Sequence, residues 1–272
     1  MSSNIIGLMW NKNEGDILPF VIEAALKHVD SLYIADDGSS DNSWSIIQRY
    51  SKQLGHFQRN PTPTDPGQRQ ALLNVVKKRY KPEDTWVQII ESDIMILDTN
   101  IREAIKKFAV LDMAVTWQLL NAVRPVGTWK EVDTYPNWSE NISKIMPLAH
   151  RIEGMLYTFR PLPMINYDAS SWKPWPKGFS NYTNKQIKDT IKLIDSPLLA
   201  HYGYRGPTHF MKKFKNIRHA KWDTSSVERV EQTVPFFNGL YSSQSHEMSR
   251  NGWKKSRSGR QWQRLAEAFN AR

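Results

Sequence analysis

Two adjacent acidic residues, Asp36 and Asp37, directly follow the short apolar segment 31–35, and Gly38 comes next. An apolar run that ends at polar residues and glycine is typical of a strand followed by a turn. The carboxyl ends of strands in open α/β sheets line the crevice where ligands bind. Two adjacent carboxylates repel each other, so a ligand or a cation often holds them. The pattern indicates a binding site at this strand end, with a solvated polar turn as the alternative.

A second acidic group, Glu91 and Asp93, follows the apolar segment 86–90. In an extended chain, residues two apart point to the same side, so these two carboxylates could bind the same ligand. Such a pair suits a hard divalent cation, Mg²⁺ or Mn²⁺, which takes oxygen donors and leaves positions for substrate phosphates. The alternative is an ordinary charged strand end.

The elements that would position these acids alternate along the first 120 residues. Apolar runs predict strands at residues 5–10, 31–35, 56–59, 86–90 and 113–119. A first helix is predicted after a cap at Asp16, and a second follows a cap at Ser40, Asp41 or Asn42 and extends to Leu54. Two further helices are predicted at residues 68–80 and 101–108. This order predicts an α/β fold with a mainly parallel sheet flanked by helices.

Three motifs occur in a fixed order: Asn13–Glu14, then DDGSSDNS from Asp36, then the triplet Glu91–Ser92–Asp93. In this order and context they resemble the family 2 glycosyltransferases of GT-A type, over residues 4–120. The family's third motif usually begins with Asp, whereas this chain has Glu91. The resemblance implies a GT-A (Rossmann-like) fold with residues 1–120 as the nucleotide-sugar-binding half.

The same resemblance implies an inverting transferase that uses a nucleotide diphosphate sugar, here a UDP-sugar, and a divalent cation, Mn²⁺ or Mg²⁺. Asp36 would accept a hydrogen bond from the ring N–H of the nucleobase. His201, at the end of an apolar run, would complete the metal site with Glu91 and Asp93, and His209 is its competitor. The donor-binding residues that it implies are Asn11, Asn13, Glu14, Asp36, Asp37, Arg69, Ser92, Arg205 and Lys212.

The acceptor-binding and metal-completing half is expected at residues 121–215. This half is rich in proline and tryptophan and predicts irregular structure, with a short helix at residues 186–194. In the family this half supplies a carboxylate base. Asp168, which follows the apolar run 162–167, is preferred, and Asp133 is next; a turn cap is the alternative reading of Asp168. The other candidates are Glu131 and Glu153.

The formal charge of +10 is uneven: residues 201–272 contain 14 Lys and Arg against 5 Asp and Glu, a net +9. A basic C-terminal extension at residues 216–272 therefore indicates an anionic acceptor, and the alternative is a basic face that binds nothing in particular. One class is a cell-surface glycan or glycolipid. The other is DNA with hydroxymethylated bases, where Lys and Arg would contact phosphates and the tail's tryptophans would stack on a displaced base. A non-catalytic nucleotide- or glycan-binding module is a further alternative.

The chain has no cysteine, which excludes a disulfide scaffold and a thiolate metal site. It has no apolar run of 18 residues, and its N-terminus predicts a strand rather than a signal peptide. These features predict a cytoplasmic protein that is peripheral to a membrane or associated with DNA. Its oligomeric state, sugar and linkage are left open.

Overall fold

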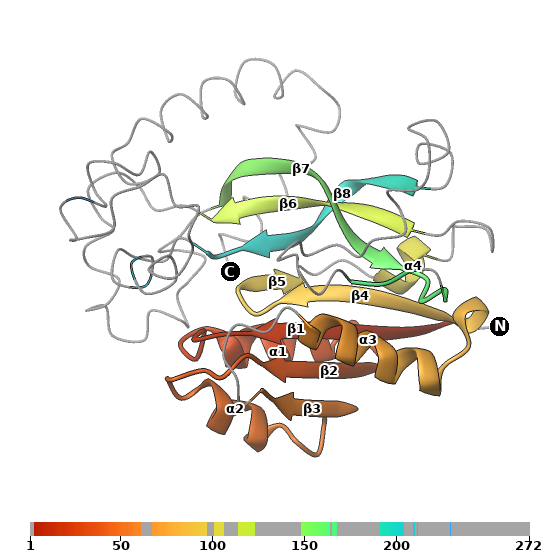
Figure 1. The fold of residues 1–272 in the computed structure, drawn as a ribbon. Helices are drawn as coiled ribbons and strands as arrows, with labels where there is room; N and C mark the ends of the chain where they lie inside the picture. The colour runs from red at the N-terminus through yellow and green to blue at the C-terminus, as the bar shows by residue number, and fades with distance from the viewer. Residues whose placement is uncertain are drawn as a thin grey trace. The chain divides into compact units, whose positions relative to one another are not determined.

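The computed structural model describes residues 3–60, 67–96, 101–105, 114–122, 148–163, 165–167 and 191–203, with residues 209, 211 and 229 (Figure 1). The chain divides into two compact units. One combines Met1–Gln118 with Glu153–Leu198, and the other combines Leu119–Ile152 with Leu199–Arg272. The predicted boundaries after residues 120 and 215 stay predictions.

Four parallel strands form the part of the sheet that positions the acids. They are β1 (Asn4–Asn11), β2 (Ser31–Asp36), β3 (His56–Arg59) and β4 (Thr85–Glu91), in the order β3-β2-β1-β4. Ile5, Met9, Ile34 and Val87 are among their fully buried side chains. Strands that are covered on both faces must be apolar almost throughout, which is why these segments are near-continuous hydrophobic runs.

The sheet continues beyond β4 with a change of direction. β7 (Leu148–Phe159) pairs antiparallel with β4, with Phe159 opposite Val87. The sheet then includes β6 (Ala114–Ala122), β8 (Ile191–His201) and β5 (Ile94–Ile96), in the full order β3-β2-β1-β4-β7-β6-β8-β5.

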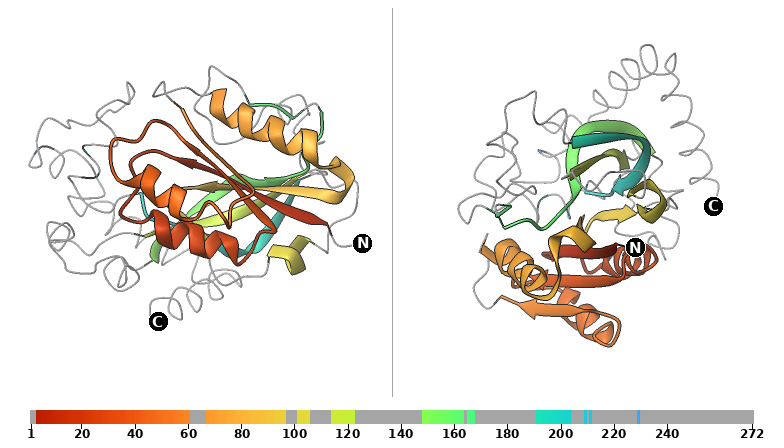
Figure 2. Two further views of the ribbon diagram at one scale, coloured as in Figure 1. Left: turned by 90° about the horizontal axis from the view of Figure 1, so that it is seen from below. Right: turned by 90° about the vertical axis from the view of Figure 1, so that its right-hand side faces the viewer.

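Helices cover both faces of the parallel strands (Figure 2). α1 (Leu18–Leu26) and α2 (Ser43–Arg49) lie on one face, and α3 (Gly67–Arg79) lies on the other. The remaining helical elements are η1 (Pro82–Asp84) and α4 (Ile101–Ile105). The predicted α/β fold with a mainly parallel sheet is confirmed. None of the described helices is long and apolar enough to cross a membrane.

Several local predictions are wrong. Asp16 is not the N-cap of α1, because Ile17 takes that position. Pro19, which lacks an N–H, lies in the first turn of the helix. α2 ends at Arg49 and does not reach Leu54. The helix expected at residues 186–194 is contradicted from Ile191 onward, where β8 begins. The half expected to be irregular contains two long strands, β7 and β8.

The predicted basic C-terminal extension is not tested, because it falls outside the described residues apart from Arg229.

Candidate functional site

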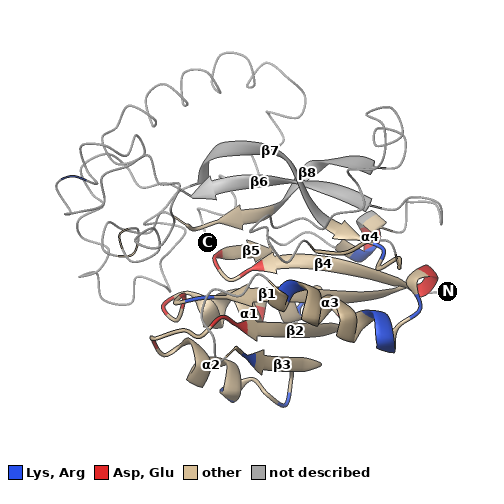
Figure 3. Cartoon of the chain, in the orientation of Figure 1, with Lys and Arg blue, Asp and Glu red and all other residues tan. Residues whose placement is uncertain are grey.

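The register of the parallel strands brings polar residues into one row at the carboxyl edge of the sheet, and Figure 3 shows acidic residues at the ends of β2 and β4. Asn11 at the end of β1 pairs with Asp36 at the end of β2, and Asp36 pairs with Arg59 at the end of β3. On the other side of β1, Trp10 pairs with Glu91 at the end of β4. The acids that the sequence places at strand ends therefore share the edge at which α/β proteins bind their ligands.

Asp36 is completely buried and is held by its own chain. Its Oδ1 accepts hydrogen bonds from Asn11 Nδ2, at 2.7 Å, and from the Ser39 hydroxyl. Its Oδ2 accepts from the Ser39 N–H at 3.1 Å and lies 3.4 Å from Arg59 Nε. Because both oxygens are engaged, a nucleobase N–H could bond to Asp36 as predicted only in competition with these contacts.

The loops after β1 and β2 are tied to each other. Asn13 has a positive φ of 55°, a conformation that Asn tolerates better than most residues. Its N–H donates to Ser39 Oγ at 2.9 Å, and its Oδ1 accepts from the Ser40 N–H at 2.7 Å. Asp41 accepts from the N–H groups of Gly15 and Ser43, both at 2.9 Å, and so it joins the first loop to the start of α2.

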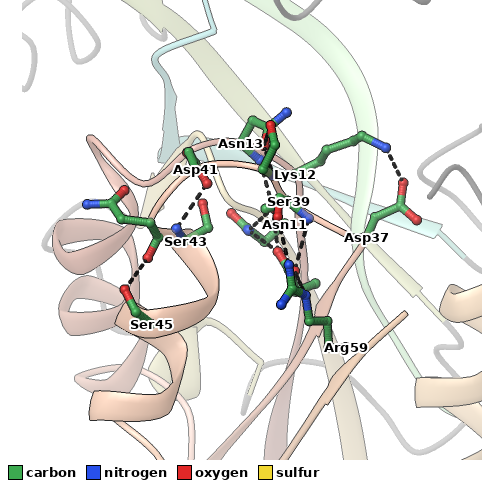
Figure 4. Close-up of polar contacts among 12 residues, drawn as sticks. Asn11, Lys12, Asn13, Asp37, Ser39, Asp41, Ser43, Ser45 and Arg59 are labelled. Carbon is green, nitrogen blue, oxygen red and sulfur yellow. Dashed lines mark hydrogen bonds and ion pairs between the residues drawn. The ribbon is translucent and has the colours of Figure 1, made fainter. Parts of the chain in front are cut away.

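The second acid of the motif is turned away from the Asp36 cluster. Figure 4 shows the Asp37 side chain directed toward Lys12, and Asp37 Oδ2 lies 3.1 Å from Lys12 Nζ. Its backbone N–H donates to the Asn11 carbonyl at 2.8 Å. Glu14 is also buried, and its carbonyl accepts from the N–H groups at the start of α1. The predicted donor residues Asn11, Asn13, Glu14, Asp36 and Asp37 thus surround one corner of the sheet.

The end of β4 is more open. The Glu91 side chain is 29% exposed, whereas Ser92 and Asp93 are buried. Arg69, in the first turn of α3, lies with Nη2 3.8 Å from Glu91 Oε1, and its guanidinium stacks on the Trp10 ring at 3.6 Å. Burial lowers the pKa of Arg69, while nearby Glu91, Tyr167 and Asp37 raise it. Arg69 is therefore the partner of Glu91 at this edge, as Lys12 is of Asp37 and Arg59 is of Asp36.

Glu91, the last residue of β4, and Asp93, two residues later, fit a divalent cation of the hard class. Their oxygens are the ligands that Mg²⁺ and Mn²⁺ prefer, and Glu91 is accessible to solvent. Within the described residues, however, no three Asp, Glu or His side chains form a group that could hold an ion. An ion held by Glu91 and Asp93 would consequently depend on other ligands, such as the phosphates of a substrate.

The other predicted site residues are placed only in part. His201 is the last residue of β8 and belongs to the second unit, and its role as a metal ligand stays a prediction. Glu153 lies in β7. The residues outside the described part of the chain are Asp168, Asp133, Glu131, Arg205 and Lys212.

Sequence reasoning missed several residues at this edge. Ser39 and Arg59 hold Asp36, and Tyr167 is buried near Arg69 and Glu91. Ser39 belongs to the DDGSSDNS motif and could have been found there. Arg59 and Tyr167 carried no sequence signal, because strand pairing and chain packing bring them to the edge.

Comparison with known proteins identifies the family. The family model of glycosyl transferase family 2 matches residues 8–160, which include β1 to β4, the acidic edge and β7. No curated protein matches the chain at a significant level.

Solved structures that resemble the chain at low sequence identity include the following three. S. aureus TarS residues 1–349 with UDP-GlcNAc has 13% identity, coverage of 98% of this chain and 80% of that chain, and a TM-score of 0.43. The mannosyltransferase PcManGT from Pyrobaculum calidifontis, with GDP-Man and Mn²⁺, has 13% identity, coverage of 100% and 86%, and a TM-score of 0.46. Glucosyl-3-phosphoglycerate synthase from Mycobacterium tuberculosis, with Mn²⁺ and UDP, has 12% identity, coverage of 78% and 79%, and a TM-score of 0.41.

The assignment rests on the family model, which covers more than half of the chain and includes all three ordered motifs at the carboxyl edge of the sheet. The chain belongs to glycosyl transferase family 2.

Proposed function

We propose that this glycosyltransferase moves a sugar from a UDP-sugar to a hydroxyl group of a cell-surface glycan or glycolipid, with inversion at the anomeric carbon and with the help of a divalent cation. The observation that carries the proposal is the row of polar residues at the carboxyl edge of the parallel strands. Asn11, Asp36 and Glu91 lie there in register, within the region that the family model matches.

Two buried amides support a donor site at this edge. Asn11 Oδ1 is buried and accepts no hydrogen bond from any described residue. In Gln68, at the start of α3, neither the amide oxygen nor the amide nitrogen has a partner among the residues that the structure describes. Gln68 shares with Leu72 and Val76 the buried face of α3, the helix that contacts β1 and β2. Buried polar groups are almost always paired, so these amides point to a polar ligand such as a nucleoside.

The cation would be held by Glu91 and Asp93 together with the donor's diphosphate. When bound, it would stabilise the negative charge that develops on the departing diphosphate. Arg69, which lies beside Glu91, would add a second positive charge to this end of the donor. Asp36 would keep the two loops in the conformation that receives the nucleoside.

The transfer itself requires a base. The acceptor hydroxyl oxygen attacks the anomeric carbon, the bond to the diphosphate oxygen breaks, and a carboxylate takes the hydroxyl proton. Asp168 is the proposed base and Asp133 the second candidate. Asp168→Asn should abolish transfer and leave UDP binding intact, as measured by calorimetry; near-normal transfer in this variant would reject the role.

The proposed function is tested by donor turnover. Release of UDP from a panel of UDP-sugars should require Mn²⁺ or Mg²⁺ and stop when EDTA is added, and calorimetry should show UDP binding that strengthens with Mn²⁺. Undiminished turnover in EDTA would contradict the cation's role. Binding of UDP without turnover of any donor would favour the non-catalytic module instead.

The +9 charge of residues 201–272 favours DNA as a second candidate acceptor. If about four of its Lys and Arg residues contact duplex phosphates, affinity should fall about 150-fold between 50 and 200 mM salt. The same protein should be titrated with duplex DNA and with vesicles that contain anionic lipid. Binding to the vesicles alone would support the glycan or glycolipid acceptor, and binding to DNA alone would support the second candidate.

A further inference from the structure

The helix α3 holds a distant part of the chain through a row of polar side chains. This part is residue 163 together with residues 165–167, which follow β7 and are called the strap below. Lys77 Nζ donates to the carbonyl oxygens of Pro163 at 3.2 Å and Ile165 at 2.5 Å, and to Asn166 Oδ1 at 3.0 Å. Gln70 accepts a hydrogen bond from the Tyr167 N–H at 2.6 Å and donates to Asn166 Oδ1 at 3.1 Å.

The donors and acceptors of Lys77 and Gln70 pair with acceptors and donors of the strap. An ammonium has three donors, and the three contacts of Lys77 use them all. Gln70 and Lys77 lie seven residues apart, which places them two turns apart on one helix face. Asn74 lies between them and accepts from Gln70 Nε2 at 2.6 Å. Leu72 and Val76 are buried on another face of α3, so apolar packing anchors the helix independently of the strap.

The strap ends beside the proposed donor site. Tyr167 is its last residue, is 8% exposed, and is close enough to Arg69 and Glu91 that both influence the pKa of its phenol. Burial raises that pKa above its ordinary value. Arg69 and Gln70 are adjacent in α3. Arg69 lies beside Glu91 at the end of β4, and Gln70 accepts a hydrogen bond from Tyr167 at the end of the strap.

We propose that Gln70 and Lys77 are positioning residues for sugar transfer: they hold the strap, and with it Tyr167, against the helix whose first turn carries Arg69, the partner of Glu91. The inference rests on the proposed function, because Glu91 and Arg69 matter only if the donor's diphosphate binds there. The proposed base, Asp168, directly follows Tyr167 in the sequence. Disturbing the strap should slow transfer more than it weakens donor binding.

Three variants of neighbouring residues test the inference. Lys77→Met removes the three donors but keeps an unbranched side chain, Lys77→Arg restores donors, and Lys78→Met changes the exposed lysine next in sequence. We expect Lys77→Met to lower kcat about tenfold or more while the Kd for UDP with Mn²⁺ changes less than about threefold. Lys77→Arg should recover most of the loss, and Lys78→Met should behave like the wild type.

Hydrogen exchange provides a readout that does not depend on turnover. The Tyr167 amide should exchange slowly in the wild type and markedly faster in Gln70→Ala, because that amide donates to Gln70. Equal exchange rates in the two proteins would overturn the inference. It would also be overturned if Lys77→Met lowered the melting temperature but left kcat unchanged below it, because the contacts would then be structural only. Failure of the proposed function would appear differently, as a wild type that neither binds UDP nor turns over a donor.

Discussion

The ends of β2 and β4, on either side of β1, both carry acids, but these acids differ in burial and in hydrogen bonding. At the end of β2, Asp36 is fully buried and accepts hydrogen bonds from Asn11 and Ser39. At the end of β4, Glu91 is 29% exposed and faces a single described cation, Arg69, at 3.8 Å.

The difference separates an acid that builds the site from acids that can bind a ligand. A carboxylate whose oxygens already accept hydrogen bonds from its own chain stabilises the fold and gives up those contacts at a cost. A partly exposed carboxylate near a second acid retains capacity for a cation. By this criterion Asp36 shapes the loops, whereas Glu91 retains capacity for a cation.

The largest expected effect is at the end of β4. Asp93→Ala should lower metal-dependent turnover by at least about 100-fold, because a metal can supply several kcal/mol of charge stabilisation and each 1.4 kcal/mol is about tenfold in rate. Glu91→Ala should cost less, because in the family that the sequence resembles the last acid of this triplet, here Asp93, usually contacts the ion directly. Turnover at several Mn²⁺ concentrations measures both. Glu83→Ala, an exposed acid just before β4, is the control, and a loss as large as that of Asp93→Ala would show that the effect is not local.

A smaller effect is expected at the end of β2, and it should appear in stability. Asp36→Asn removes an ionised acceptor of buried hydrogen bonds and should lower the free energy of unfolding by about 1.5–3 kcal/mol. The ion pair adds little to this loss, because the Arg59 side chain is 44% exposed. Urea denaturation measures the change. If the UDP affinity falls instead while stability is kept, Asp36 contacts the nucleobase as the sequence predicted.

The smallest expected effect concerns the cation between the two regions. Arg69→Gln should strengthen the binding of Mn²⁺ alone by up to about fivefold, because a partly exposed ion pair that competes for Glu91 is worth up to about 1 kcal/mol. The same variant should weaken UDP binding. Electron paramagnetic resonance of free Mn²⁺ measures the first quantity. Arg79→Gln, at the other end of α3, should change neither, and weaker Mn²⁺ binding in Arg69→Gln would mean that Arg69 orients Glu91 for the ion.

Much of the parallel sheet could be predicted because its strands are buried on both faces. The predicted strands at residues 5–10, 56–59 and 86–90 differ from β1, β3 and β4 by one residue or less at each end. The segment from Ile191 was misassigned because a short apolar pattern fits either a helix or a strand, and pairing with other strands decides. The first turn of α1 was misassigned because Pro19 favours a helix start that needs no acidic cap.

The candidate site could be predicted only where residues adjacent in sequence define it. The ends of β2 and β4 follow directly from apolar runs that stop at acids, so the sequence alone predicts Asp36, Glu91 and Asp93 as candidate site residues. Arg59 reaches Asp36 through strand pairing, and Lys77 reaches Ile165 across 88 residues of sequence. Contacts of this kind depend on the folded chain, and a single sequence contains no local pattern that marks them.

The left-handed conformation of Asn13 has a consequence for ligand recognition. A loop whose unusual backbone angle is secured by hydrogen bonds to Ser39 and Ser40 has already lost the conformational freedom that binding would otherwise remove. A ligand that enters beside it meets a preorganised surface and keeps more of its interaction free energy as affinity. Recognition at this corner of the sheet should therefore proceed with little change in the backbone of the loop, and discrimination between nucleobases should come from a fixed shape.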